Sequence, residues 1–395
     1  MPTDMHFNTQ YIVLLHVVTC QITTVQLLHF VNDIPLNSPM DEDLYQEATM
    51  ETTELINFYG YPAENYTVYT VDGYILTIHR IPHGKQNSGN VTRKPILLMH
   101  GILASSAYFI ESGKPSLGFF LADNGYDVWL GNMRGNFYSD HTKYNRKDKQ
   151  FWDFSWEEMA EYDVPMMIDF VLKATSFEKL MYVAHSMGTT VSFALFSTQP
   201  DYHKKVSGFI ALSPIGSLLV INIFGVSSVP NLKPKYFKLE ASFCPESDPI
   251  LCSLGIALSG GYSEDLRNKS RDFLYAIHAS AGASFRTLDH FAQMALRKGL
   301  YRYDYGRFKN LFMKYKKTTP PQYFLNKISI PVVLFHSAND AFADPLDVTI
   351  LSRNLPNLLG IELVGPPTMN HLDMIYALDA KNIYHDKLLS YLNKM

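Results

Sequence analysis

Residues 180–190, LMYVAHSMGTT, place one serine between an apolar run typical of a strand and a run typical of a helix start. Ala184, Ser186 and Gly188 follow the pattern small-x-Ser-x-small, which is characteristic of the sharp strand-to-helix turn that presents a nucleophilic serine. A serine hydroxyl is a weak nucleophile, so it needs an adjacent base and donors for an oxyanion. Because the pentapeptide also arises by chance, the rest of the chain has to decide its meaning.

The composition is typical of a globular protein with a large core. The chain has 395 residues, of which 47% are hydrophobic and 13% aromatic. That length suits one large α/β domain with an insertion, or two ordinary domains. The net charge is −4, and no Lys or Arg precedes Arg80. The mild basic excess after Arg80 is not the clustered basic face of a nucleic-acid-binding protein, so we expect no nucleic-acid partner.

Short apolar runs alternate with helical patterns along most of the chain. This alternation predicts a mostly parallel sheet with helices on both faces, preceded by a hairpin around Asp72 and Gly73. This alternation of strand-like and helical patterns is absent between residues 214 and 319. We therefore expect an α/β core of residues 31–213 and 320–395 with a cap or lid insertion at 214–319. The predicted strands are 66–70, 74–80, 95–99, 126–130, 179–184, 206–212, 331–335 and 360–364, with helices before Gly125, at 157–172, after Ser186, from Pro345 and at the C-terminus.

The expected cap begins with an uncharged stretch that could be mistaken for a membrane span. No charged residue occurs from Val206 to Leu232, but proline and glycine residues interrupt the run. A buried strand followed by an apolar cap segment fits this pattern better than a transmembrane helix. We expect the apolar residues of 218–224 to cover the site at the serine turn, with packing inside the cap as the alternative.

The N-terminus contains an apolar segment, residues 11–18, of the length of a signal-peptide core. Polar residues interrupt any longer apolar span beyond it. The pattern therefore favours a secretory signal peptide at residues 1–20, with cleavage after Cys20, over a membrane anchor.

Cysteines and sequons also favour the secretory route. If Cys20 leaves with the signal, Cys244 and Cys252 remain as an even pair, which predicts a disulfide; two buried free thiols are the alternative. Asn65, Asn90 and Asn268 each begin an Asn-x-Ser/Thr sequon for glycosylation. We expect a secreted glycoprotein, with lysosomal delivery as the alternative.

Two aspartates are candidates for the acid that orients a catalytic histidine. Asp340 follows the strand predicted at 331–335, at the sheet edge where α/β proteins place ligands and catalytic groups. Asp344 precedes Pro345 and is better suited to capping the next helix. We therefore predict Asp340 as the acid.

His371 is the predicted general base, because the order serine, aspartate, histidine is the one this kind of turn uses. His185 lies too rigidly beside the serine to serve. The predicted oxyanion donors are the backbone N–H groups of Met187, which follows the nucleophile, and Ile102, in the loop after the strand at 95–99. The amide of Leu103 is the alternative to that of Ile102.

Seven longer blocks carry a more specific signal than the serine motif. They are GYPAENYTVYTVDGYILTIHRIP from Gly60, LLMHGILASS from Leu97, LADNGYDVWLGNMRGN from Leu121, FWDFSWEEMAEYDVPMMIDF from Phe151, YVAHSMGTT from Tyr182, NDAFADPLDV from Asn339 and NHLDMIYALDA from Asn370. From Thr53 onward the chain resembles the acid lipase family of gastric and lysosomal lipases, which has many insect members. The resemblance implies an α/β-hydrolase fold with a helical cap, and a catalytic triad of Ser186, Asp340 and His371.

The chain departs from the family pattern mostly around the site. The family usually has Gly-His-Ser-Gln-Gly, where this chain has Ala184 and Met187. A serine and an alanine, residues 337–338, replace a paired glycine, and the cap segment 278–284 lacks an expected proline and threonine. These changes affect the expected choice of substrate and leave the triad intact.

The serine motif and the order of the candidate triad predict a serine hydrolase, and the resemblance implies a lipase that hydrolyses triacylglycerols or cholesteryl esters at a lipid–water interface. No metal or organic cofactor is implied, because no His/Cys cluster has zinc spacing. Alternatives are a serine peptidase with the same triad, or a non-catalytic lipid-binding member of the fold. A non-catalytic protein would be free to lose Ser186, Asp340 or His371, and all three are present.

Overall fold

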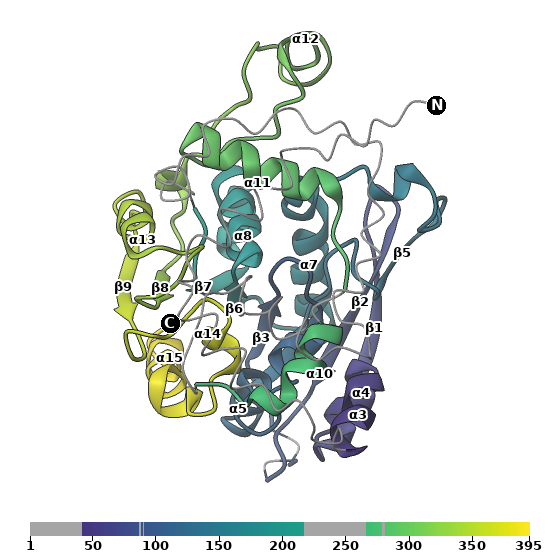
Figure 1. The fold of residues 1–395 in the computed structure, drawn as a ribbon, viewed down its shortest axis with the longest axis vertical. Coiled ribbons are helices and arrows are strands. Elements are labelled where there is room, and N and C mark those ends of the chain that lie inside the picture. The colour runs from purple at the N-terminus through teal and green to yellow at the C-terminus, as the bar shows by residue number, and fades with distance from the viewer. Residues whose placement is uncertain (1–41, 87, 90, 217–265, 279–280) are drawn as a thin grey trace, which may run out of the picture.

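A nine-stranded sheet forms the centre of the molecule. The structure, a computed structural model, describes residues 42–86, 88–89, 91–216, 266–278 and 281–395 (Figure 1). The strand order is β1-β2-β4-β3-β6-β7-β8-β9, with β5 also paired to β2. The strands are β1 (Glu64–Tyr69), β2 (Tyr74–Ile81), β3 (Pro95–Met99), β4 (Asp127–Leu130), β5 (Ser139–His141), β6 (Leu180–His185), β7 (Val206–Leu212), β8 (Val332–His336) and β9 (Leu358–Leu363). From β4 to β9 the neighbours are parallel, whereas β1, β2 and β4 pair antiparallel, so the predicted mostly parallel sheet is confirmed.

Helices cover both faces of this sheet, as Figure 1 shows. In β3, Leu97 and Met99 pack in the same core cluster as residues of α7 and α8, while Ile96 and Leu98 pack with residues of α4, α5 and α15. Successive side chains of a strand point to opposite faces, so a strand that is apolar throughout is buried on both sides. The α-helices are α3 (Glu42–Thr49), α4 (Thr52–Phe58), α5 (Leu117–Asp123), α6 (Trp156–Glu158), α7 (Val164–Thr175), α8 (Met187–Thr198), α10 (Asp272–His278), α11 (Phe285–Arg297), α12 (Arg307–Lys309), α13 (Pro345–Ser352), α14 (Asp373–Tyr376) and α15 (Asp386–Leu392).

Several expected features fall outside the described residues. These are the signal peptide at 1–20, Asn90, the apolar run 218–224, and both Cys244 and Cys252. The described part of the insertion at 214–319 contains α10, α11 and α12 and contributes no strand to the sheet. The helix expected at 157–172 is divided by a π-helical turn at Met159–Asp163.

A buried arginine joins three segments near the sheet. Arg134, 2% exposed, donates from Nε to Asp163 at 2.8 Å and from Nη1 to Asp72 at 2.6 Å. Its guanidinium also lies 4.0 Å from the ring centroid of Tyr74. Because the charge is desolvated, it depends on these two carboxylates, and they fix the loop after β4 against the β1–β2 turn and the start of α7.

We expect Asp163→Ala to lower the free energy of unfolding by about 3–5 kcal/mol, because it removes the fully buried partner of Arg134 and leaves this buried charge with the partly exposed Asp72 alone of the two carboxylates. The control is Asp169→Ala, which breaks the half-exposed pair with Lys205 at 2.5 Å and a hydrogen bond from the Tyr202 hydroxyl at 3.0 Å, and should cost about 1–2 kcal/mol. Urea unfolding of both variants measures the difference. Equal losses would show that the Arg134 pair contributes no more than a surface pair.

Candidate active site

Ser186 occupies a sharp turn between β6 and α8. Its backbone has φ 55° and ψ −124°, a positive φ that is rare for a residue with a side chain and is typical of strained functional turns. The turn is tight enough to require Gly188, since a Cβ there would lie 2.7 Å from the Met99 carbonyl oxygen and 2.8 Å from that of His100. The other small residue of the motif, Ala184, is buried, and its methyl group would lie 3.3 Å from a Cβ placed on Gly188.

The structure brings together the three residues that the sequence predicts as a triad. The Oγ of Ser186 lies 2.8 Å from Nε2 of His371, and Nδ1 of His371 lies 2.9 Å from both carboxylate oxygens of Asp340. All three are buried. With Nδ1–H donating to the carboxylate, Nε2 is free to accept the serine proton, which is the arrangement that activates a serine nucleophile.

The two candidate aspartates have different environments. Asp340 accepts hydrogen bonds from the N–H groups of Phe342 and Ala343 at 2.9 and 2.7 Å. Burial alone would raise the pKa of Asp340, but the charge and hydrogen bond of His371, helped by the Ala343 amide, outweigh it and lower the pKa to about 2. Asp344 instead caps α13, accepting from the N–H of Leu346 at 2.8 Å.

This electrostatic setting predicts a pH dependence of stability. The pKa of Asp340 falls from its ordinary 3.8 to about 2 on folding, so its stabilising contribution is complete above about pH 4 and is lost as the pH falls through 2. Each pH unit between the two values corresponds to about 1.4 kcal/mol. We expect Asp340→Asn to remove this part of the acid dependence, measured as free energy of unfolding between about pH 2 and 6. An equally steep acid dependence in the variant would contradict the assignment.

His185 holds the backbone of the predicted base, a role that the sequence did not suggest. Its Nε2–H donates to the His371 carbonyl at 3.2 Å, and its Nδ1 faces the Tyr108 hydroxyl at 3.3 Å. Burial, together with the nearby His371, lowers the pKa of His185 well below its usual value, so the ring is neutral. The Asn370 side-chain oxygen accepts from the N–H groups of Leu372 and Asp373, both at 2.9 Å, and fixes the same loop. Only the three-dimensional contact reveals these positioning roles.

The loop after β3 lies directly against the serine. A Cβ on Gly101 would be 3.1 Å from Cβ of Ser186, a tight contact that the glycine avoids as the backbone approaches the serine. His100 fixes this loop, because Nδ1–H donates to the Gly101 carbonyl at 2.7 Å while Nε2 accepts from the Met133 amide at 3.1 Å. Leu103 has φ 62°, and its carbonyl accepts from the N–H of Ala281 at 3.0 Å. The expected cap therefore touches the loop beside the serine.

The two predicted oxyanion donors belong to the two segments that meet here, since Met187 follows Ser186 and Ile102 follows Gly101. Met187 is the first residue of α8, where backbone N–H groups have no partner within the helix and the helix dipole favours negative charge. Ile102 follows Gly101 and packs its side chain on the core. Among the described residues, neither N–H donates to another part of the chain. Both amides are thus available to a ligand.

The remaining predicted sites differ in exposure. Asn65 is exposed on β1, at the edge of the sheet, and Asn268 is half-buried just before α10, with its side-chain oxygen 2.7 Å from the Ser270 hydroxyl. Within the described residues, no group of three His, Cys, Asp or Glu side chains could hold a metal ion. None of the helices that the structure describes is both long enough and apolar enough to cross a bilayer.

Comparison with known proteins yields consistent matches. The family model for the alpha/beta hydrolase fold matches residues 94–240, and that for the partial alpha/beta-hydrolase lipase region matches residues 52–113. Gastric triacylglycerol lipase of Mus musculus is 38% identical over 364 residues, which is 87% of this chain and 92% of the relative. Lysosomal acid lipase/cholesteryl ester hydrolase of Homo sapiens is 34% identical over 368 residues, or 88% of this chain and 92% of the relative.

Solved structures share the fold at much lower identity. A carboxylesterase from Bacillus subtilis matches with a TM-score of 0.50 at 15% identity, covering 89% of this chain and 97% of that one. Naproxen esterase from the same organism has a TM-score of 0.50 at 14% identity, covering 91% and 100%. At such identity the likeness concerns the fold alone.

Proposed function

Since this chain belongs to the acid lipase family of gastric and lysosomal lipases within the α/β hydrolases, we propose that it is a serine-dependent lipase. Its substrates would be carboxylic esters of neutral lipids, triacylglycerols or cholesteryl esters, the two classes named in its relatives. The observation that carries the mechanism is the continuous contact from Ser186 through His371 to Asp340.

In the first half of the reaction, Nε2 of His371 removes the proton from Ser186 as Oγ attacks the ester carbonyl carbon. The Asp340 carboxylate stabilises the imidazolium that forms, and the N–H groups of Met187 and Ile102 bind the oxyanion of the tetrahedral intermediate. The intermediate collapses as His371 donates its proton to the departing alcohol oxygen. An acyl ester on Ser186 remains.

In the second half, water attacks the acyl-enzyme and loses its proton to His371. The second tetrahedral intermediate uses the same oxyanion donors, and His371 returns the proton to Ser186 as the fatty acid leaves. Because His185 binds the His371 carbonyl and not the reacting Nε2, it holds the loop in place without competing for the proton.

The proposal also assigns a role to each part of the chain. We assign catalysis to a core of residues 31–213 and 320–395, and substrate cover to a cap of residues 214–319. All strands of the described sheet fall in the core, and the Ala281–Leu103 hydrogen bond supports a cap seated beside the site. A lid role for 218–224 and a disulfide between Cys244 and Cys252 belong to this proposal and concern residues outside those described.

We further propose that the protein enters the secretory route, with secretion as the main fate and lysosomal delivery as the alternative. The exposed position of Asn65 on an edge strand is compatible with a bulky glycan. A loss of apparent mass on enzymatic deglycosylation of the expressed protein, and its recovery from the medium, measure the two parts of this proposal.

The function is tested by assaying the purified protein on triacylglycerols, cholesteryl esters and peptides across a range of pH. The proposal expects turnover of the lipid esters and none of the peptides. A peptidase would show the reverse selectivity, and a non-catalytic lipid-binding protein would show no turnover of any substrate. Either outcome would replace the lipase proposal.

A further inference from the structure

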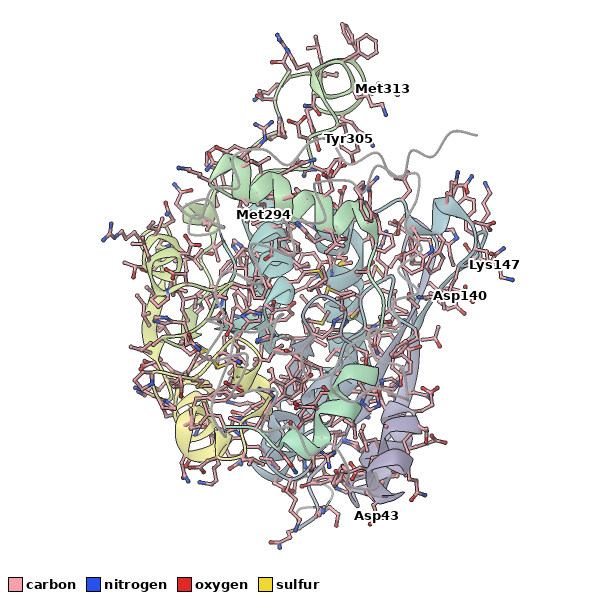
Figure 2. The ribbon with its side chains drawn as sticks, in the orientation of Figure 1. Asp43, Asp140, Lys147, Met294, Tyr305 and Met313 are labelled. Atoms are coloured by element: carbon pink, nitrogen blue, oxygen red, sulfur yellow. The ribbon has the colours of Figure 1, made fainter. Side chains whose placement is uncertain are left out.

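A small helical tip, defined here as residues 306–317, projects beyond α11. Figure 1 shows α12 at the far end of the projection, and Figure 2 shows Met313 on it, with Tyr305 closer to the body. Phe308, Phe312 and Met313 are 71%, 67% and 68% exposed, and the two phenyl rings lie 4.8 Å apart. Single exposed apolar residues are ordinary, but a contiguous group at a protruding position indicates an interaction surface.

The tip is also strongly basic. It carries five cationic residues, and the sequence has no Asp or Glu between Asp304 and Asp340. No ion pair joins any of the five to another described residue, although Nζ of Lys314 lies 4.5 Å from the ring centroid of Tyr305. The cationic residues are Arg307, Lys309, Lys314, Lys316 and Lys317.

The tip is held in shape by the fully buried Asn310. Its Nδ2 donates to the Asp304 carboxylate at 2.7 Å and to the Thr318 carbonyl at 3.2 Å, while its Oδ1 accepts from the N–H of Tyr305 at 3.0 Å. The hydroxyl of Tyr315 donates to the Tyr303 carbonyl at 2.8 Å. The exposed side chains are therefore presented on an ordered support, and binding would not have to order the backbone first.

We propose that the tip docks the enzyme onto a lipid surface that carries negative charge. Apolar side chains flanked by Lys and Arg match such a surface, because the apolar groups enter the acyl boundary while the cations meet the anionic head groups. An acidic protein partner would not require so many exposed apolar atoms at an isolated projection. The proposal rests on the proposed lipase function, since it assigns the surface through which the enzyme meets its substrate phase.

The test uses flotation with phosphatidylcholine vesicles that either contain or lack phosphatidylserine. We expect tighter binding to the anionic vesicles, weakened by salt. Phe308→Ser with Phe312→Ser, and separately Lys316→Gln with Lys317→Gln, should each weaken binding to anionic vesicles by about tenfold or more. Phe137→Ser, at an aromatic residue 49% exposed on another part of the surface, is the apolar control and should bind normally.

The charge control is Lys143→Gln with Lys147→Gln, which removes two exposed lysines outside the tip and should leave binding unchanged. Every variant should keep the thermal stability and the soluble short-chain ester turnover of the parent. The proposal is overturned if the tip variants bind vesicles as tightly as the controls do, or if the tip proves to mediate self-association in sedimentation and not vesicle binding. Absence of ester turnover in the unmodified protein would refute the lipase proposal instead, independently of the vesicle result.

Discussion

Replacing Ser186 by alanine is expected to lower kcat for ester hydrolysis by about 10⁴- to 10⁶-fold while leaving the protein folded. The hydroxyl supplies the covalent bond to the acyl group, and no other group of the site replaces it. Its loss should cost little stability, because the turn is held by backbone contacts: the Ser186 amide donates to the Leu212 carbonyl at 3.1 Å, and the Ser186 carbonyl accepts from the Thr189 amide at 2.8 Å.

Ser192→Ala provides the matched control for that experiment. Ser192 is another buried serine of α8, and its hydroxyl bonds to the Gly188 carbonyl at 2.6 Å and to the Tyr182 hydroxyl at 3.1 Å. We expect a loss of about 1 kcal/mol in unfolding free energy and little change in kcat. Lipase activity retained in the Ser186 variant, with active enzyme titrated in both preparations, would refute the acyl-enzyme mechanism.

The second large loss of activity is expected on replacing Asp340, the acid of the triad. Asp340→Asn should lower kcat by about 10⁴-fold, because an amide in that position no longer fixes the Nδ1–H tautomer of His371 or stabilises its imidazolium. The carboxylate now touches Nδ1 with both oxygens at 2.9 Å, so its replacement acts directly on the base. Single-turnover measurements with a soluble ester separate this loss of chemistry from any change in binding.

Asp344→Asn is the control for the acid, four positions along the chain. Asparagine caps helices about as well as aspartate, so the hydrogen bond to the Leu346 amide should survive and unfolding free energy should change by less than about 1 kcal/mol. We expect kcat to be unchanged. Similar mild losses in the Asp340 and Asp344 variants would mean that neither carboxylate orients His371.

The low pKa of Asp340 also predicts how activity should respond to acid. With its pKa held at about 2, the Asp340 carboxylate stays ionised through most of the acid range and continues to support His371 there. A fall of activity on mild acidification would therefore be assigned to a group other than Asp340.

Much of the architecture could be predicted because it depends on local patterns. The mainly apolar runs at 95–99 and 206–212 coincide with β3 and β7, because a strand buried on both faces is rich in apolar residues along its whole length. The strand predicted at 360–364 begins earlier, at Leu358, because β9 lies at the sheet edge and alternates half-buried with exposed residues. The π-helical turn before α7 left no local signal that distinguishes it from an ordinary helix.

For the candidate site too, the sequence identified the residues and the tertiary structure showed their contacts. Sequence alone determined the candidates Ser186, Asp340 and His371, because the serine turn has a local signature and the order of the other two is characteristic of the fold. Only the tertiary structure placed Nε2 of His371 next to a serine 185 positions away, and only it revealed that His185 binds the His371 backbone. The tertiary structure alone also showed that Asn310 of the tip is buried while Phe308 and Phe312 are exposed. Local preference fixes where strands, turns and caps occur, whereas contacts between distant side chains arise from the packing of the whole sheet and are not written in any single stretch of the chain.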